Sequence, residues 1–417
     1  MVLPGSDNSL FFEKSIATEA RDSFRKDALA SLIGGLYTGA TAPFILYIAR
    51  DRLHSSVALI GLINASFYIG SMFGMLWANA VGGKRIVRFT TWVWVLGRSL
   101  NLLILLAYTP LVFALTITAI QFIATICTPA YAAIMKAIYP DDQRGKIMGY
   151  CRVCLALATI AGTFAAGSIL HRWADSYRMV FAGAGLVGIG AALIFGRIKM
   201  PIREESDPSP PLHMFIGDSL DILRRNKRYR WFAISVFTYG VGFLLLSPIY
   251  PIYQVDVLHI KATQLAMLSN ISQIAYMISF LYWGSYVDRN SPIRAAFLSI
   301  LVSLLIPLNY MFSHSVWALW PAFVVQGFFS AGIELSYFNC TLYLAESDKI
   351  AQYQGLHTFL LGIRGIIAPF AGVAIMESGI DIKVIFFIGL VIMLIGGVVQ
   401  AVALKKDHIA ASNGGAE

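Results

Sequence analysis

An acidic and a basic residue stand inside long apolar runs of the sequence. Glu334 lies in the run 315–343 and Arg364 in the run 352–377. Counted from the polar ends of these runs at helical rise, Glu334 lies about 13 Å deep and Arg364 about 18 Å deep. Ionisable side chains are costly in hydrocarbon, and those found there usually serve ion or substrate pathways. We therefore interpret Glu334 as a proton-binding carboxylate, with Arg364 as its counter-ion or as a contact for an anion.

A purely structural pair is the alternative, because two opposite charges on neighbouring helices can hold those helices together. Glu334 is nevertheless the only acidic residue that we expect well inside the hydrocarbon, since Asp51, Asp256, Glu377 and Asp381 fall near the outer ends of their runs. Desolvation favours the neutral form of a carboxylate and an adjacent arginine favours the charged form. Such a balance would let proton binding, ligand binding and conformation influence one another.

The elements that carry these residues are predicted to be membrane-spanning helices. Of 417 residues, 57% are hydrophobic and only 13% are charged, against about 25% charged in soluble domains. The apolar runs have the length of about 20 residues that a bilayer span needs, and their continuity favours helices over alternating strands. Twelve spans are predicted, at about 27–49, 56–80, 89–109, 111–137, 146–170, 178–197, 230–255, 262–285, 293–313, 315–343, 352–377 and 382–404.

A polar connector at 198–229 divides the chain into two sets of six spans. We expect an all-α membrane protein of two pseudo-symmetric six-helix bundles, 27–197 and 230–404, with polar ends at 1–26 and 405–417. Lysine and arginine are concentrated in the two ends, the connector and alternate loops, which predicts that both termini lie in the cytoplasm. That distribution explains the net charge of +9 without a nucleic-acid partner.

No pattern in the sequence indicates a metal site or an enzyme. Cys151 and Cys154 have the CxxC spacing, but no second cysteine pair accompanies them, so helix packing is the favoured interpretation. The sequence contains no P-loop, HExxH or nucleophile-elbow motif. We expect no cofactor; the expected partners are the lipid bilayer, a small organic substrate and protons, and the chain is expected to be a monomer.

The two halves repeat one another in sequence. At a shift of 205 residues, Asp51 and His54 fall on Asp256 and His259. At a shift of 206, five more residues fall on identical ones: Leu62, Asn64, Ser66, Trp77 and Arg88 on Leu268, Asn270, Ser272, Trp283 and Arg294. Parallel six-helix repeats with a site near the membrane midplane, between the halves, describe a known transporter plan.

The loop after the eighth span adds a motif. The segment from Gly284 to Asp288 and Arg289 is similar to the G-x-x-x-D-R motif of the major facilitator superfamily, which the chain resembles over 27–404. The equivalent loop of the first half, 78–85, keeps the basic end but lacks the glycine and the aspartate. The resemblance implies that Asp288, Arg289 and Arg294 latch the cytoplasmic side when the protein opens outward.

The same resemblance implies alternating access around a cavity between spans one, four, seven and ten. Aromatic and amide side chains there suit partly apolar ligands that form hydrogen bonds, although several are expected to serve only interhelical hydrogen bonds. The candidate cavity residues, with one arginine of the third span, are Tyr37, Thr41, Gln121, Tyr239, Tyr253, Gln254, Gln326, Tyr337, Asn339 and Arg98.

Three functions remain open at this point. The first is a proton-coupled secondary transporter for a small organic molecule in a bacterial inner membrane. Export is slightly favoured, because Ala158, Gly162, Ala166 and Gly167 keep the small residues, though not the proline, of an exporter pattern in the fifth span. The second is a facilitator or symporter for a small organic anion bound by Arg364. The third is a receptor or scaffold that does not transport, against which the costly Glu334 argues.

Overall fold

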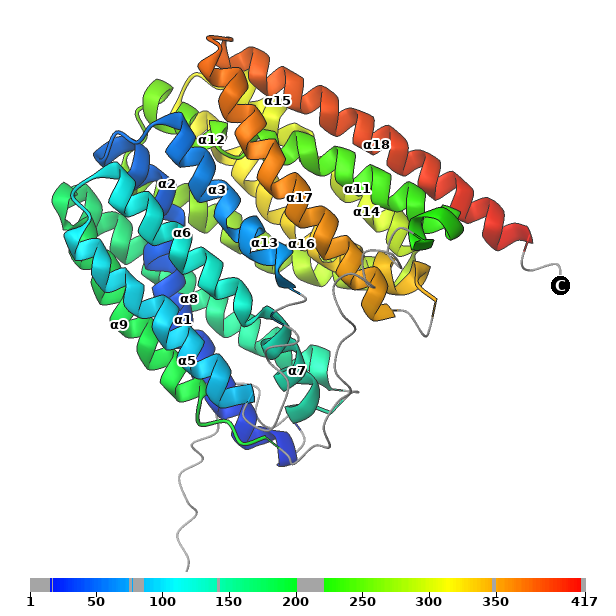
Figure 1. The fold of residues 1–417 in the computed structure, drawn as a ribbon, viewed down its shortest axis with the longest axis horizontal. Coiled ribbons are helices and arrows are strands. Elements are labelled where there is room, and N and C mark those ends of the chain that lie inside the picture. Colours follow the sequence, from blue (N-terminus) through cyan, green and yellow to red (C-terminus); the bar gives the residue numbers. More distant parts are fainter. Residues whose placement is uncertain are drawn as a thin grey trace, which may run out of the picture.

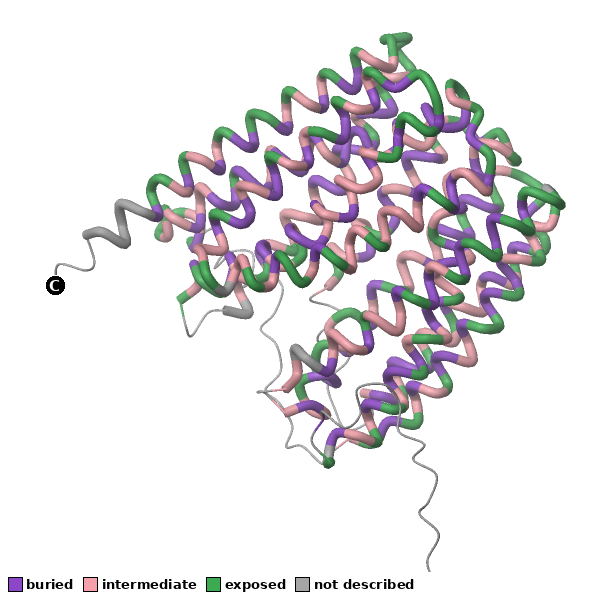
Figure 2. The backbone as a smooth tube through the Cα atoms, turned by 180° about the vertical axis from the view of Figure 1, so that it is seen from behind, coloured by how far each residue is buried: buried purple, intermediate pink, exposed green. Residues whose placement is uncertain are grey.

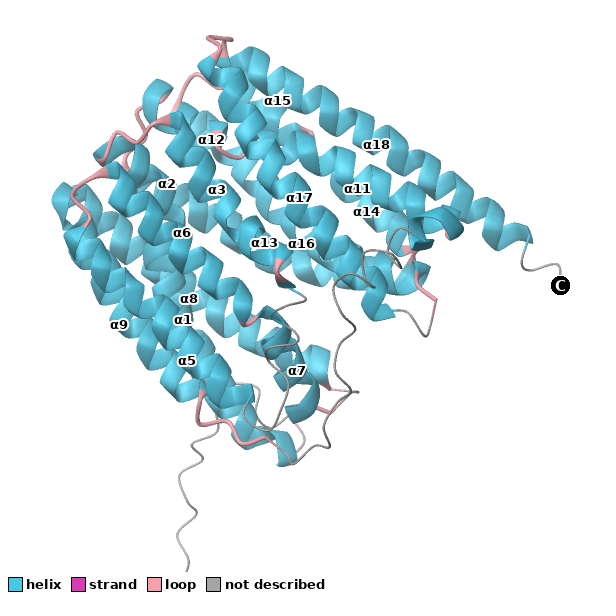
Figure 3. Ribbon diagram, in the orientation of Figure 1, coloured by secondary structure: helices cyan, strands magenta, loops and turns pink. Residues whose placement is uncertain are grey.

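The computed structural model describes Ile16 and residues 18–74, 77, 86–140, 143–200, 221–346 and 350–413. Every regular element in these ranges is a helix, as Figure 3 shows. Eleven of the described helices are long and apolar enough to cross a membrane. A shorter apolar helix, α3, takes the place of the second predicted span, whose last residues (78–80) lie outside the described ranges. The all-α fold is confirmed.

The N-terminal bundle is built around the first span. Helix α1 packs against α8 and α9, while α6 packs against α3 and α5 (Figure 1). Its elements are η2 (Thr18–Ala20), α1 (Arg21–Thr41), η3 (Ala42–Phe44), α2 (Ile45–Tyr47), η4 (Ile48–Arg52), α3 (Val57–Met72), α5 (Ile86–Ser99), η5 (Leu100–Leu106), α6 (Pro110–Ile126), α7 (Thr128–Ile138), α8 (Arg144–Arg172), η6 (Ala174–Ser176) and α9 (Tyr177–Phe195).

The C-terminal bundle repeats this plan. Helix α11 packs against α17 and α18, while α16 packs against α13 and α14. Its elements are α11 (Lys227–Leu246), α12 (Ile249–Ile252), η7 (Tyr253–Val257), α13 (Ala262–Arg289), α14 (Pro292–Ser303), α15 (Leu305–Phe312), η8 (Val316–Leu319), α16 (Trp320–Leu344), α17 (Ile350–Glu377) and α18 (Ile382–Asn413).

Short polar residues set where several spans begin. The Thr109 side chain accepts a hydrogen bond from the backbone N–H of Val112, and proline follows it at the first helical position. Ser291 and Pro292 start α14 in the same way. Threonine or serine before proline is a strong helix start, because the hydroxyl satisfies a free backbone N–H and proline has none to satisfy.

The internal repeat appears in the backbone where spans one and seven end. The π-helical turns η4 (Ile48–Arg52) and η7 (Tyr253–Val257) match at the predicted shift of 205 residues. Just beyond them, His54 has a φ of 47° and His259 a φ of 49°. A positive φ is uncommon for a residue other than glycine, so two such residues at one shift agree with the repeat that the sequence predicts.

Small residues allow the helices within a bundle to approach closely. A Cβ on Gly39 of α1 would lie 2.1 Å from the carbonyl oxygen of Thr159 on α8, a separation that no side chain allows. Helices in lipid gain no hydrophobic stabilisation when they associate. Glycine at a helix interface lets the two backbones pack closely, and this van der Waals packing holds the helices together instead. Figure 2 shows the result, with buried residues on the faces where helices meet and exposed ones on the outward faces and loops.

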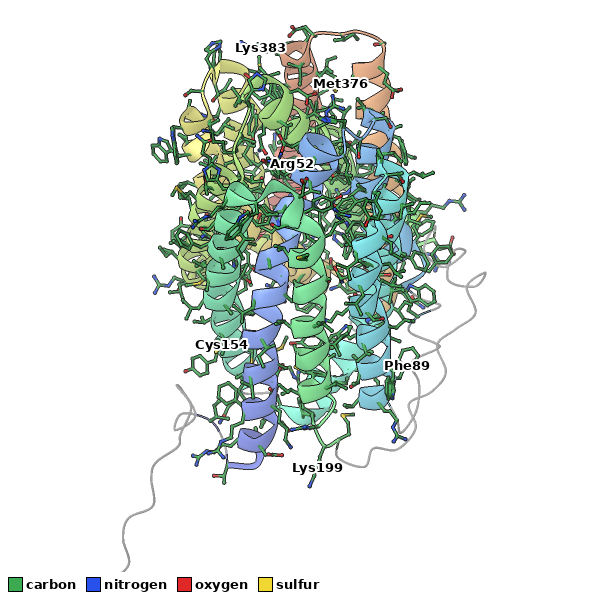
Figure 4. All side chains as sticks on the ribbon, turned by 90° about the vertical axis from the view of Figure 1, so that its left-hand side faces the viewer. Arg52, Phe89, Cys154, Lys199, Met376 and Lys383 are labelled. Atoms are coloured by element: carbon green, nitrogen blue, oxygen red, sulfur yellow. The ribbon has the colours of Figure 1, made fainter. Side chains whose placement is uncertain are left out.

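The two bundles touch along two pairs of helices, α3 with α17 and α8 with α13. They converge at the end that carries η4 and η7 and diverge toward the opposite end (Figure 1). Figure 4 shows Met376 and Lys383 at the first end and Lys199 at the second. We call these the outer and inner ends, following the sides that the charge distribution predicts.

Candidate functional site

A charged contact joins the two bundles on the inner side. A nitrogen of Arg152 on α8 lies 3.6 Å from a carboxylate oxygen of Glu334 on α16. The hydroxyl of Tyr276 on α13 donates a hydrogen bond of 2.6 Å to the other carboxylate oxygen. The Glu334 side chain remains 46% exposed and that of Arg152 remains 53% exposed. Glu334 therefore stands at the bundle boundary, between a cation of the opposite bundle and a tyrosine of its own.

This geometry corrects the partner expected for Glu334. Among the described residues, no ion pair joins Glu334 to Arg364. The Arg364 guanidinium turns toward α11 and donates to the carbonyl oxygen of Val236. Depth along a helix does not decide which way a side chain faces. Arg152, which snorkelling to the interface would explain from sequence, is the cation that Glu334 meets.

A second charged contact joins the bundles at the outer end. Nε of Arg50 in η4 lies 2.9 Å from both carboxylate oxygens of Asp256 in η7. Nη1 of Arg50 donates a further hydrogen bond of 2.7 Å to the carbonyl oxygen of Ser55. The pair links the repeated π-helical turns, in which Asp256 is the sequence counterpart of Asp51. A cavity of about 280 Å³ at this end includes Asp51 and Lys261 in its wall.

Two candidate cavity residues of the first bundle lie within that bundle instead. The hydroxyl of Tyr37 accepts a hydrogen bond of 3.4 Å from the amide of Asn101. The Arg98 guanidinium lies 5.6 Å from the ring centre of Tyr37 and 5.1 Å from that of Trp94, and it donates to the carbonyl oxygen of Gly188. Cation–π contacts and a carbonyl acceptor satisfy the buried charge. In this conformation Tyr37 and Arg98 thus join α1, α5 and α9, and their place in a substrate cavity stays a prediction.

Two aromatic and amide candidates of the seventh span are also used inside their bundle. The Tyr239 hydroxyl donates to the Ser303 hydroxyl at 2.8 Å, and the Gln254 amide donates to the Tyr310 hydroxyl at 2.6 Å. Both side chains are buried. These hydrogen bonds join helix to helix, so the Tyr239 hydroxyl and the Gln254 amide nitrogen already have partners in this conformation.

The remaining polar candidates differ in how many of their hydrogen-bonding groups already have partners. Tyr253 donates to the carbonyl oxygen of Ser313 at 2.6 Å, and Thr41 to that of Tyr37 at 2.9 Å. Asn339 donates to the carbonyl oxygen of Leu335 on its own helix. Two candidates of α16 keep unused hydrogen-bonding capacity among the described residues. Gln326 bonds to Ser330 on its own helix, and the buried Tyr337 hydroxyl has no hydrogen-bonding neighbour other than Arg364. Gln121 lies half-buried on α6.

Sequence reasoning overlooked a buried carboxylate in the first span. Helix α1 begins at Arg21, so Asp27 lies inside it and is only 2% exposed. The hydroxyl of Tyr139, at the end of α7, donates to Asp27 at 2.9 Å. Glu334 is therefore not the only carboxylate within a span. The signal was visible in the sequence as an aspartate at the first residue of a predicted span.

The predicted latch lies at the end of α13. Arg289 is exposed at the last helical residue, and Arg294 lies in the first turn of α14. The side chain of Asp288 and the first-half loop 78–85 fall outside the part of the chain that the structure describes. The latch therefore stays a prediction.

The fold and the contacts between bundles define the class of the protein. Two repeated six-helix bundles that meet along two helix pairs are the architecture of a membrane transporter that binds its substrate between repeats. The sequence profile of the Major Facilitator Superfamily matches in two overlapping segments, residues 28–369 and 232–416. The chain belongs to this superfamily. It is accordingly a multi-pass membrane transporter of a small molecule, and not an enzyme.

Solved structures show the same fold at low sequence identity. A point mutant of the nucleoside transporter NupG aligns with a TM-score of 0.70 at 14% identity, over 91% of this chain and 99% of that one. A bacterial homologue of the human lysosomal transporter Spinster, in an inward-facing and occupied conformation, aligns with a TM-score of 0.65 at 12% identity, over 95% and 98%. None of the curated proteins searched matches the sequence.

Proposed function

We propose that the protein is a proton-coupled secondary transporter that exports a small organic molecule by alternating access, from a bacterial inner membrane with both termini in the cytoplasm. Glu334 carries the proposal, because it is a span carboxylate placed between the bundles rather than within one. It receives a hydrogen bond from Tyr276 and faces Arg152 of the opposite bundle. Ionisable groups in this position are typical of proton relays in transporters.

The contacts of Glu334 connect protonation to bundle movement. When Glu334 is charged, it attracts Arg152 and links α16 to α8 near the inner end. When Glu334 binds a proton, that attraction is lost and only the tyrosine hydrogen bond remains. A proton that binds better in one bundle arrangement shifts the population toward it by its difference in affinity. Proton binding would thereby favour one of the two access states.

We propose export as the direction of transport because of the pattern of small residues in α8. Gly162 lets the backbone of α8 approach α1, since a Cβ there would lie 2.6 Å from the carbonyl oxygen of Leu36. Everted membrane vesicles test the direction: acidification of the lumen should drive accumulation of an exporter's substrate. Accumulation only in right-side-out vesicles would reverse the assignment.

Proteoliposomes test the coupling site. The substrate is first selected by thermal stabilisation from dyes, sugars, amino acids, organic acids and nucleosides, since a ligand of the folded state raises its stability. Glu334→Gln should abolish accumulation driven by a pH gradient, while exchange of labelled for unlabelled substrate continues. Glu377→Gln, the same change at an exposed outer position, should leave both unchanged. Equal loss of accumulation and exchange in Glu334→Gln would contradict a specific role in coupling.

A further inference from the structure

Arg364 is a charge at the centre of the membrane with little to balance it. It stands 12 residues into the span Gln352–Glu377 and 13 from its end, which places it about 18–20 Å from either surface. The residue is only 5% exposed. Among the described residues, no carboxylate forms an ion pair with it. Arginines within membranes normally pair with a carboxylate or backbone carbonyls, or face a cavity.

The guanidinium has more donors than acceptors. One Nη1 bond goes to the carbonyl oxygen of Val236, while the buried Nε has no partner among the described residues. The buried hydroxyl of Tyr337 lies beside the guanidinium, which is its hydrogen-bonding neighbour, and has no other acceptor for its own O–H within the described part of the chain. Buried donors without acceptors are destabilising, and more so when they carry charge. A fork-shaped cation and a phenol therefore present unused donors side by side.

Two glycines leave room for the Arg364 side chain and for the tyrosine beside it. A Cβ on Gly240 of α11 would lie 2.0 Å from Nη1 of Arg364, so only glycine at that position leaves room for the guanidinium. A Cβ on the following residue, Gly365, would lie 2.1 Å from the ring of Tyr68. Tyr68 belongs to α3 of the opposite bundle. Arg364 therefore lies next to a contact between bundles, where the midplane sites of two-bundle transporters are found.

We propose that Arg364 and Tyr337 bind the carboxylate of a small, partly apolar organic acid, and that Tyr68 covers this site until the bundles rock apart. The inference rests on the proposed transport function and gives the class of its substrate. A carboxylate accepts two parallel hydrogen bonds from one guanidinium. The aromatic rings of Tyr68, Tyr337 and His357, the last 5.4 Å from Tyr337, provide an apolar wall for the rest of the molecule.

Charge balance favours a carboxylate over a phosphate ester. Arg364 is the positive charge that interacts electrostatically with Tyr68, Tyr239 and Tyr337. One guanidinium neutralises one carboxylate, whereas a phosphate monoester carries about −1.5 to −2 charges near pH 7. A phosphate would bring its second charge into a largely aromatic surrounding. A monocarboxylate matches both the single charge and the apolar wall.

The test compares acids with their own amides in purified full-length protein in nanodiscs. The probes are benzoate, phenylacetate and hexanoate, each beside its primary amide, with phenyl phosphate as the phosphate probe. At least one carboxylate should raise the thermal midpoint of the wild type by several degrees in a saturable way, and its amide should not. Arg364→Gln should weaken that binding at least tenfold. Stabilisation by phenyl phosphate alone would overturn the carboxylate assignment.

The protein without ligand gives a second, independent measurement. If Arg364 is an unfilled anion site, Arg364→Met removes an unbalanced buried charge and should leave the ligand-free thermal midpoint unchanged or raise it. If Arg364 only anchors α17 to α11, the same change should lower that midpoint, which would overturn the proposal. Gly240→Ala should displace the guanidinium and abolish carboxylate binding, while Gly149→Ala, with open space around its Cβ, should not. No response to any carboxylate would also overturn it.

These measurements do not depend on proton coupling. Binding is measured at one pH without a gradient, so it can fail while Glu334→Gln still separates accumulation from exchange. In the opposite case, carboxylate binding at Arg364 can hold while the Glu334 variant shows no coupling defect. The two failures are therefore distinguishable.

Discussion

Two arginine–carboxylate pairs join the opposite bundles, one at the outer end of the molecule and one on its inner side, within the spans. At the outer end, Arg50 holds Asp256 through two Nε contacts of 2.9 Å and also bonds to the backbone of its own loop. On the inner side, Arg152 approaches Glu334 only to 3.6 Å. The outer pair is a rigid clamp, while the inner pair is a loose attraction. The outer contact therefore holds the two bundles together at the outer end, while the inner contact constrains their relative position less.

The difference follows from burial and from the elements that carry the side chains. Arg50 and Asp256 are 22% and 34% exposed, and both stand in π-helical turns that meet one another. Arg152 and Glu334 are 53% and 46% exposed, on the sides of two long helices. Exposed pairs contribute little, because water screens the charges and the long side chains must be ordered. Two pairs of the same chemistry therefore have different functions.

Breaking the outer clamp should have the largest effect on conformation. Arg50→Gln removes charge-assisted hydrogen bonds that we estimate at about 2 kcal/mol after allowing for partial exposure, or about thirtyfold in the ratio of access states. The outer-open population should rise. Spin labels at the exposed Trp173 and Ile380, on opposite bundles, would report longer distances by pulsed electron resonance.

Arg52→Gln is the matched control for the outer clamp. Arg52 pairs with Asp51 of its own segment at 2.9 Å, so its removal changes the same charge in the same turn without touching the contact between bundles. The distance distribution should stay as in the wild type. If both variants opened the outer end equally, surface charge rather than the Arg50–Asp256 contact would be responsible.

Breaking the inner pair should have a smaller effect in the same direction. Arg152→Gln removes an attraction worth at most about 1 kcal/mol, or about fivefold in the ratio of states. Because the pair is formed in the conformation that is closed at the outer end, its loss removes stabilisation from that conformation, and the outer-open population should rise slightly in the same distance measurement. Arg225→Gln serves as control, because its one ion pair among the described residues is an exposed pair with Asp221 in the same helix. A decrease in the outer-open state would contradict the assigned role of Arg152.

The smallest expected effect is a difference in how strongly salt weakens the two ion pairs. The Debye length falls from about 10 Å at 0.1 M to about 3 Å at 1 M ionic strength, and exposed pairs are screened more than partly buried ones. In about 1 M potassium chloride, the difference between Arg152→Gln and the wild type should vanish, while most of the effect of Arg50→Gln should persist. Equal attenuation of both would show that the two contacts do not differ in burial in the membrane.

Much of the fold was predictable from sequence, because a bilayer permits few solutions. The predicted eleventh span 352–377 matches the span Gln352–Glu377, and the repeat that aligned His54 with His259 matches their shared positive φ. The candidate site was predicted less well. Tyr37 and Tyr239 have the composition of cavity residues, yet both hydroxyls bond within their own bundles. Composition does not report which face of a buried helix meets the other bundle.

The sequence by itself determined the two-bundle plan, the superfamily and the positions of Glu334 and Arg364 within their helices. Length and hydropathy suffice for the helices, because every backbone polar group in lipid must be satisfied within helices, and the internal repeat and the loop motif indicate the two-bundle plan and the superfamily. Only the tertiary structure decided the partners: Arg152 and Tyr276 for Glu334, and a backbone carbonyl for Arg364. A side chain's partner depends on helix rotation and on the approach of distant segments, which packing against small residues sets and local sequence does not encode.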